Sequence, residues 1–345
     1  MSLRELPIPD FYQDERVADV WRVPYQERAI DAQKWRASHQ IRPSSQDDFT
    51  ICLVLVDVQN TFCTPEFELY VGGRSGNGAV ADSQRLTQFI YKNLASIAQI
   101  CPTMDTHQAV QIFHGIFLVD ARGKHPEPYT LITAEELEQG VWRFNPKIAG
   151  HFAMDKVDAE TYLKHYGRQL KASGKYDLTI WPYHAMLGGI GHALVAAVEE
   201  AVFFHTICRS SQADFQIKGN QPWTENYSVL KPEIVRDADG KEIAPKNQDL
   251  IEKLLSFDAL IIAGQAKSHC VAWTVADLLT EIEQRDASLA DKIYLLTDCT
   301  SPVVIPEVID YTDAADAAYQ SFEAAGMHLV KSTDPMSEWP GFFEM

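Results

Sequence analysis

The chain has 345 residues, of which 46% are hydrophobic, and a formal net charge of −18. This length and composition allow a large core, in two domains or in one large domain with additions. The acidic balance argues against nucleic acid and against a membrane surface as partners, because both attract clusters of Lys and Arg. We find no run of the roughly 18 or more apolar residues that a membrane span requires.

The beginning of the chain shows no apolar signal core, and the six cysteines are widely spaced without a CxxC pair. In so long a chain, this spacing favours reduced thiols over a disulfide framework. We therefore expect a cytoplasmic protein. The cysteines are Cys52, Cys63, Cys101, Cys208, Cys270 and Cys299.

The first half of the chain predicts few regular elements. Residues 1–49 are polar, with prolines and aromatic residues, and we interpret them as an extension that packs on the body or on a neighbouring subunit. Residues 50–59 are almost continuously apolar, as in a strand covered on both faces. Residues 82–100 have apolar positions at helical spacing, and residues 109–120 predict a weaker strand or a loop. The segment of about 115–180 is polar and weakly periodic, which indicates an insertion rather than a separate domain.

The second half alternates helices and strands. Residues 191–207 predict a helix that runs into a strand, and residues 249–264 predict a helix followed by a buried strand. Residues 268–284 predict a helix that opens at or just before Cys270. The remaining elements are a strand (292–302), a helix (313–326) and an edge strand (328–334).

This alternation with short connections predicts an α/β fold, with a mainly parallel central sheet between two layers of helices. We expect a single domain over residues 50–335, preceded by the extension of residues 1–49 and interrupted by the insertion at about 115–180. Ligands of such open sheets bind at the carboxyl ends of the strands.

Chemistry-bearing residues follow several of the predicted elements. Asp57 ends the first strand, Asp105 and His107 follow the first helix, and Cys270 follows the buried strand "ALIIAG". Each also has an ordinary explanation: Asp57 as a helix cap, Asp105 and His107 as a hydrogen-bonded pair, and Cys270 as a small apolar residue. Lys218 follows a stretch in which apolar and polar residues alternate. Most lysines are solvated surface charges. Beside a thiol, however, a lysine lowers the thiol pKa.

Histidines suggest a metal site. Asp105 and His107 are followed by His114, and His184 lies in "WPYH". One carboxylate and two or three imidazoles suit Zn, Fe or Mn. For His114, the alternative to metal binding is an ordinary core or surface position.

Five segments, in order, resemble the nicotinamidase/isochorismatase-like cysteine hydrolases. "LVDVQNTF" resembles the D-x-Q-x-x-F segment of that family, and "MDTH" its D-x-H metal segment. "WPYHAMLGGIGHAL" is similar to its W-P-x-H stretch, and "IKG" with "NYSVL" to its lysine segment. "LIIAGQAKSHCVAWTVADL" is similar to its nucleophile segment. The resemblance covers roughly residues 50–114 and 180–333, and it implies the isochorismatase-like three-layer fold.

The resemblance also implies a catalytic triad and an oxyanion hole. Cys270 would attack, Asp57 would move protons and Lys218 would support the thiolate. The backbone N–H groups of Cys270 and Ala266 would bind the oxyanion. A cis peptide between Gln265 and Ala266 belongs to the same pattern.

The implied metal is a divalent ion held by Asp105, His107 and His184, with water or His114 completing the shell. No organic cofactor is implied. The W-P-x-H element favours the metal-dependent amidase branch of the family, and hence hydrolysis of a small-molecule amide such as nicotinamide. Self-association into a homo-oligomer is also expected.

The pocket walls would include Phe62, Trp181 and Tyr227, for which ordinary core packing is the alternative. Two departures from the family pattern alter the lining, since His269 precedes the nucleophile where an aromatic residue is usual and Ala185 stands where many relatives have cysteine. Together with the inserted segment, these changes leave open another amide, a carbamoyl compound or a ureido acid as substrate.

Two other classes of function are weighed against hydrolysis. A non-catalytic scaffold of this fold is disfavoured, because a scaffold needs none of Asp57, Lys218 and Cys270. The glycines of "LGGIGHAL" do not form a G-x-G-x-x-G turn after a strand, which argues against a dinucleotide-binding oxidoreductase.

Overall fold

The computed structural model describes residues 4–152, 156–174 and 176–342. Six parallel strands form its central sheet, in the order β12-β9-β8-β1-β2-β7, which confirms the predicted fold class. These strands are β1 (Ile51–Val56), β2 (Ile97–Asp105), β7 (Gln216–Lys218), β8 (Ala259–Gly264), β9 (Ile293–Leu296) and β12 (His328–Val330).

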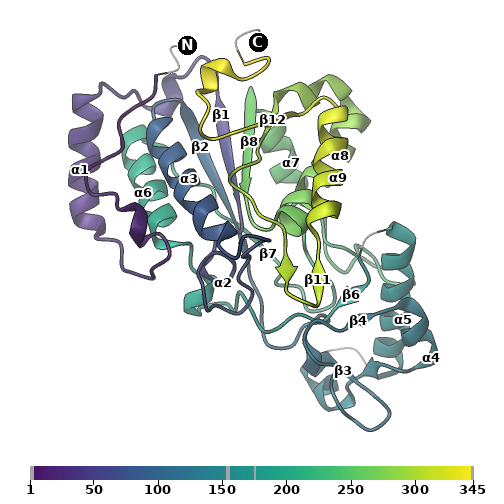
Figure 1. Ribbon diagram of the computed structural model, residues 1–345. Coiled ribbons are helices and arrows are strands. Elements are labelled where there is room, and N and C mark those ends of the chain that lie inside the picture. The colour runs from purple at the N-terminus through teal and green to yellow at the C-terminus, as the bar shows by residue number, and fades with distance from the viewer. Residues whose placement is uncertain (1–3, 153–155, 175, 343–345) are drawn as a thin grey trace.

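Helices cover both faces of the sheet (Figure 1). Helices α3 and α6 lie on one side, with α1 outside α6, and α7, α8 and α9 lie on the other. Because both faces are covered, β1 and β8 are buried at every residue, which explains their continuously apolar sequences. The helices are α1 (Tyr25–Ser38), α3 (Gly78–Lys92), α6 (Ala196–Arg209), α7 (Gln248–Leu255), α8 (Ala272–Arg285) and α9 (Thr312–Ala324), and a short α2 spans Asn60–Cys63.

Two sequence-based boundaries were wrong. The segment 82–100 is not one helix, because α3 ends at Lys92 and β2 begins at Ile97. The segment 191–207 contains no strand among its described residues, since α6 continues to Arg209. The aromatic and β-branched residues at the end of α6 have the composition of a strand, but they are packed as a helix between the sheet and α1.

The N-terminal extension packs on the body through α1. Arg28 pairs with Glu200 of α6, with 2.6 Å between Nε and Oε1, and its guanidinium lies 3.8 Å from the centre of the Phe11 ring. Farther along the helix pair, the Cys208 thiol donates to the carbonyl of Ala32 at 3.2 Å. Residues of the extension therefore complete the outer layer over α6.

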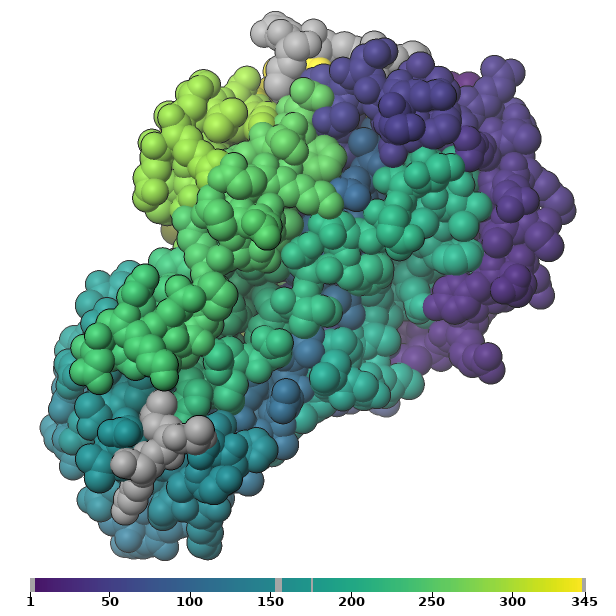
Figure 2. All heavy atoms as spheres, turned by 180° about the vertical axis from the view of Figure 1, so that it is seen from behind, coloured from purple at the N-terminus to yellow at the C-terminus, as the bar shows by residue number. Residues whose placement is uncertain are grey.

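The inserted segment forms a lobe at one end of the molecule. It contains α4 (Ala134–Gln139) and α5 (Lys156–Ser173). Figure 2 shows this teal lobe with part of the green segment that follows β7 lying across it. The Tyr162 hydroxyl donates to the carbonyl of Trp223 at 2.7 Å, which ties the two segments together. The short strand pairs of the lobe are β3 (Leu118–Val119) with β5 (Arg143–Phe144) and β4 (Leu131–Ile132) with β6 (Leu178–Thr179). A separate hairpin joins β10 (Val304–Ile305) to β11 (Ile309–Asp310).

Among the described residues, we find no helix with the length and apolar character needed to cross a membrane.

Gly264 ends β8 at a point where the neighbouring backbone leaves no room for a side chain. Its φ is +120°, and a Cβ added there would lie 2.0 Å from the carbonyl oxygen of Val56. The next residue, Gln265, donates its N–H to that same oxygen at 2.7 Å. The close approach of β8 to β1 therefore depends on glycine.

We expect Gly264→Ala to lower the free energy of unfolding by at least about 3 kcal/mol, because the strands must separate or the backbone must change its conformation. Thermal unfolding followed by circular dichroism measures this loss. Gly150→Ala is the matched control, since a Cβ there meets nothing within 4 Å. Equal melting temperatures for the two variants would contradict the role given to Gly264.

Candidate active site

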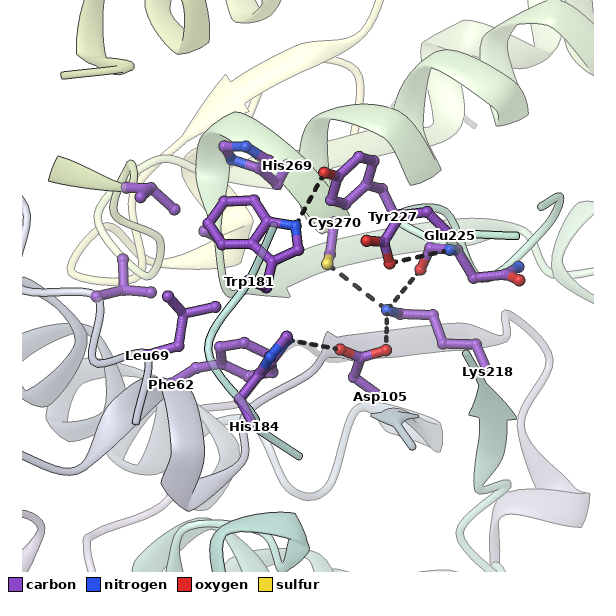
Figure 3. A pocket seen from close by; sticks show the side chains of 14 residues that line it. Phe62, Leu69, Asp105, Trp181, His184, Lys218, Glu225, Tyr227, His269 and Cys270 are labelled. Carbon is purple, nitrogen blue, oxygen red and sulfur yellow. Dashed lines mark hydrogen bonds and ion pairs between the residues drawn. The ribbon is translucent and has the colours of Figure 1, made fainter. Parts of the chain in front are cut away.

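Four side chains meet at the carboxyl ends of neighbouring strands. Asp57 follows β1, Asp105 ends β2, Lys218 ends β7, and Cys270 lies six residues after the end of β8. The Lys218 Nζ lies 3.0 Å from Asp57 Oδ2, 2.8 Å from Asp105 Oδ1 and 3.6 Å from the Cys270 sulfur. Figure 3 shows the ammonium between Asp105 and the thiol. Residues far apart in the sequence thus form one contact group.

A tight turn brings Cys270 to this edge of the sheet. A π-helical turn (Lys267–Val271) precedes α8, and the peptide between Gln265 and Ala266 is cis, as the resemblance implied. The Gln265 side chain is held at both ends: its Nε2 donates to Asp82 Oδ2 at 2.9 Å, and its Oε1 accepts the N–H of Ser301 at 3.2 Å. The strand-to-helix connection is therefore fixed from inside the protein, with Ala266 in the pocket wall.

Asp57 is fully buried and adopts a left-handed conformation, with φ of +47°. Its Oδ1 accepts a hydrogen bond from Thr103 Oγ1 at 2.5 Å, and its Oδ2 lies 3.0 Å from Lys218 Nζ. Burial raises the pKa of Asp57, although Lys218 acts in the opposite direction. An acid with a raised pKa beside a thiol has the properties of a proton acceptor.

The charges of this group are strongly coupled. Burial raises the pKa of Cys270 well above its ordinary value, against the opposing influence of Lys218. Burial would also lower the pKa of Lys218, but the carboxylates of Asp105 and Asp57 outweigh it and raise that pKa. The resting group therefore holds a neutral thiol beside a permanent cation.

Three imidazoles gather next to Asp105. One ligand atom from each of His107, His114 and His184 lies within 4.8 Å of the others. The Nδ1 atoms face the backbone carbonyls of His184, Ala109 and Pro182, at 3.2, 3.2 and 2.8 Å in the order of the three histidines. Such bonds fix the ring tautomer and direct Nε2 toward the cluster.

Buried atoms in the cluster lack hydrogen-bond partners. The Nε2 atoms of His107 and His114 are buried without one, although His107 Nε2 lies 3.1 Å from Asp105 Oδ1. Burial lowers the pKa of His107, and it lowers the pKa of His114 to about 3, so both rings are neutral at neutral pH. Neutral imidazoles with free, convergent nitrogens fit a divalent metal ion.

Asp105 is shared between the imidazoles and the lysine. Its Oδ2 lies 3.6 Å from His184 Nε2, while Oδ1 faces His107 and Lys218. Burial alone would raise the pKa of Asp105, but the Lys218 ammonium lowers it well below its usual value. The amide of Gln59 holds the backbone there, since its Oε1 accepts the N–H of Asp105 at 2.8 Å and its Nε2 donates to the carbonyl at 2.9 Å.

A pocket with about 400 Å³ of empty volume opens beside the thiol. Phe62, Trp181, Tyr227 and His269 all line it. Trp181 Nε1 donates to the hydroxyl of Tyr227 at 3.2 Å, so two walls are joined to each other (Figure 3). A flat aromatic molecule with a few polar groups suits such a lining. The remaining lining residues, which the sequence alone does not indicate, are Leu69, Val71, Glu225, Asn226 and Val303.

The inserted segment reaches the pocket next to His269. The hydroxyl of Tyr176 donates to the carbonyl of Ser268 at 2.9 Å, and its ring centre lies 4.7 Å from that of His269. Tyr311 packs against the imidazole from another side, also at 4.7 Å. Burial lowers the pKa of His269 to about 3, so this ring is neutral as well.

Sequence reasoning missed Glu225 and Gln59 as parts of the site. For Gln59, a signal was present: a polar amide directly after a buried strand needs buried partners. For Glu225, no local signal distinguishes it from the many surface acids in this chain, because its burial depends on segments distant in sequence.

Comparisons with known proteins support the fold. The chain matches no family model, and no curated protein matches it. Among solved structures, a nicotinamidase/pyrazinamidase from Acinetobacter baumanii is 17% identical with a TM-score of 0.50, covering 84% of this chain and 99% of that chain. Yeast nicotinamidase is 18% identical with a TM-score of 0.50, covering 81% and 99%. A second structure of the yeast enzyme, bound to the inhibitor nicotinaldehyde, is 17% identical with a TM-score of 0.51, covering 82% and 100%.

The chain has the isochorismatase-like fold. Its structural neighbours are nicotinamidases, at identities that establish the shared architecture alone.

The electrostatic coupling predicts opposite effects of two substitutions on the reactivity of the Cys270 thiol. Lys218→Met removes the cation that stabilises thiolate, so alkylation at pH 7 should slow. Asp57→Asn removes a negative neighbour and should accelerate it. Mass spectrometry after timed exposure to iodoacetamide measures both rates, with Cys270→Ser as background. Changes in the same direction for both substitutions would refute this account.

Proposed function

We propose that the protein is a metal-assisted cysteine amidohydrolase whose nucleophile is Cys270. One observation carries the proposal: an acid, an amine and a thiol share contacts at the mouth of the sheet, with Lys218 Nζ 3.0 Å from Asp57 and 3.6 Å from Cys270. An ion pair that only held the strand ends together would not need a thiol beside it, so the arrangement favours chemistry over packing.

The first step is attack on the carbonyl carbon of the amide. Asp57 accepts the thiol proton as Cys270 attacks, and the Lys218 ammonium stabilises the negative charge that develops on sulfur. Holding the amide beside the sulfur makes the reaction effectively intramolecular. The backbone N–H groups of Ala266 and Cys270 donate to the oxyanion.

The next steps release the two products. Asp57 returns the proton to the amide nitrogen, the C–N bond breaks, and ammonia leaves behind a thioester on Cys270. Asp57 then takes a proton from a water molecule, which attacks the thioester. Collapse of this second tetrahedral intermediate gives the carboxylic acid, and the sulfur recovers its proton.

Asp105, His107 and His184 would hold a divalent metal ion, and His114 fits as a further ligand. The partnerless, buried Nε2 atoms support this assignment. When bound, a Zn, Fe or Mn ion supplies a Lewis acid that fixes the ring nitrogen of a heteroaromatic substrate. The Cys270 thiol contacts Lys218 while the imidazoles contact Asp105, and this arrangement supports a site that would hold ring and carboxamide at once.

Nicotinamide is the best-supported substrate. The aromatic walls from Phe62, Trp181 and Tyr227 suit a flat ring, and the structural neighbours are nicotinamidases. A second candidate is hydrolysis of another amide, a carbamoyl compound or a ureido acid. The contact of Tyr176 with His269 favours it, since the inserted segment here packs against a residue of the pocket wall.

The purified protein is expected to release ammonia from nicotinamide, and Cys270→Ala should abolish the release because it removes the thiol that lines the pocket. A coupled ammonia assay with nicotinamide and a panel of other primary amides measures this. Asp57→Asn and Lys218→Met should each lower kcat at least about 100-fold.

The panel separates the candidates. Release from other amides but not from nicotinamide selects the second candidate. Absence of hydrolysis across the whole panel, in a folded protein, would leave a non-catalytic scaffold and end the proposal.

Metal analysis by mass spectrometry should find about one equivalent of a divalent ion, and the double substitution His107→Ala, His184→Ala should remove it. Chelation should suppress ammonia release while the circular dichroism spectrum stays unchanged. His165→Ala is the matched control, because that imidazole lies outside the cluster and bonds the carbonyl of Arg236. Full activity of metal-free protein would refute the metal site.

A further inference from the structure

Glu225 is a buried acid that the mechanism above does not use. Its side chain is 6% exposed and lines the pocket. Figure 3 shows the carboxyl pointing into the pocket, between Tyr227 and the Lys218 ammonium. Its Oε1 accepts the N–H of Asn226 at 3.2 Å, and the carbonyl of Asn226 in turn accepts from Lys218 Nζ at 2.8 Å. The carboxyl therefore belongs to the same wall as the catalytic ammonium.

A buried carboxyl in this position requires a reason. Burying a carboxyl costs free energy unless its oxygens are hydrogen-bonded, and an apolar residue would fill the same volume more favourably. The neighbouring turn is already held by backbone atoms of Glu225, since its carbonyl accepts the N–H of Glu233 at 2.8 Å and its N–H donates to the Tyr166 hydroxyl at 3.2 Å. These two backbone bonds do not involve the carboxyl.

In the tetrahedral intermediate of the proposed mechanism, each substituent of the reacting carbon would face a different part of the site. Sulfur comes from Cys270, the oxyanion points to the N–H groups of Ala266 and Cys270, and the ring extends toward Phe62 and Trp181. The nitrogen is left with the remaining wall, which Lys218 and Glu225 form. Asp57 delivers its proton to the lone pair of this nitrogen, so the two N–H groups remain available as hydrogen-bond donors.

A primary amide nitrogen carries two N–H donors, and a donor that is buried in the pocket needs an acceptor. A carboxyl oxygen accepts in either protonation state, because the protonated form keeps its carbonyl oxygen. Glu225 offers such an oxygen at the wall where the nitrogen must lie. Methyl esters of the same acids carry no N–H and would gain nothing from it.

We infer that Glu225 binds the nitrogen of the substrate's carboxamide and makes the enzyme selective for primary amides over the corresponding esters. This inference rests on the proposed cysteine amidohydrolase function. It defines the substrates as primary amides, which lose their nitrogen as ammonia, whatever ring or chain carries the carboxamide.

The test compares kcat/KM for nicotinamide with kcat/KM for methyl nicotinate. If only another amide of the panel is hydrolysed, that amide and its methyl ester are used. Glu225→Leu should lower the amide-to-ester ratio roughly 10- to 100-fold, mainly through the amide, because one buried hydrogen bond is lost. Glu225→Gln should keep most of the wild-type amide-to-ester ratio, since its amide oxygen still accepts the substrate's N–H. Glu225→Ala provides a second deletion variant if the leucine does not fold.

Glu233→Gln is the matched control: it alters a buried acid on the same segment that does not line the pocket, and the ratio should stay at the wild-type value. An amide-to-ester ratio unchanged in both deletion variants would overturn the role of Glu225 and leave the proposed function standing. Wild-type protein that hydrolyses neither amide nor ester would instead overturn the proposed function, and this inference with it.

Discussion

A single buried ammonium holds the candidate site together. Lys218 is 4% exposed and bonds carboxylates from two other strands, Asp57 and Asp105. Two buried carboxylates so close to each other would repel without a cation between them, and the cation would be costly without the carboxylates. The carboxyl ends of β1, β2 and β7 are therefore held together by charge as well as by backbone hydrogen bonds.

The position of this ammonium divides the site into two halves with a shared member. On one side it faces the thiol of Cys270, and on the other it faces Asp105, which also contacts His107. A change at Asp105 would thus affect both the imidazole cluster and the charge near the Cys270 thiol. The fold places these halves side by side because β8, β1, β2 and β7 are consecutive neighbours in the sheet.

Much of this arrangement can be predicted from sequence, for physical reasons. Strands buried on both faces have continuously apolar sequences, so β1 and β8 are recognisable, and the polar residues that follow them mark the functional edge of the sheet. The end of α3 was harder to locate, because the residues after Lys92 are apolar and suit a helix as well as β2. Glu225 could not be identified, since its burial depends on the packing of segments far apart in the chain. The packing of α1 on α6 is also hard to predict, because it joins segments far apart in the chain and no local sequence pattern indicates it.

The carbonyls behind the three imidazoles have a consequence for how this site can diverge. The rings of His107, His114 and His184 are oriented by main-chain oxygens, which every side-chain substitution leaves in place. A replacement of a lining residue outside this cluster, such as the histidine at position 269, leaves the carbonyls that orient the imidazoles in place. The shape of the pocket can therefore vary while the three rings keep their orientation.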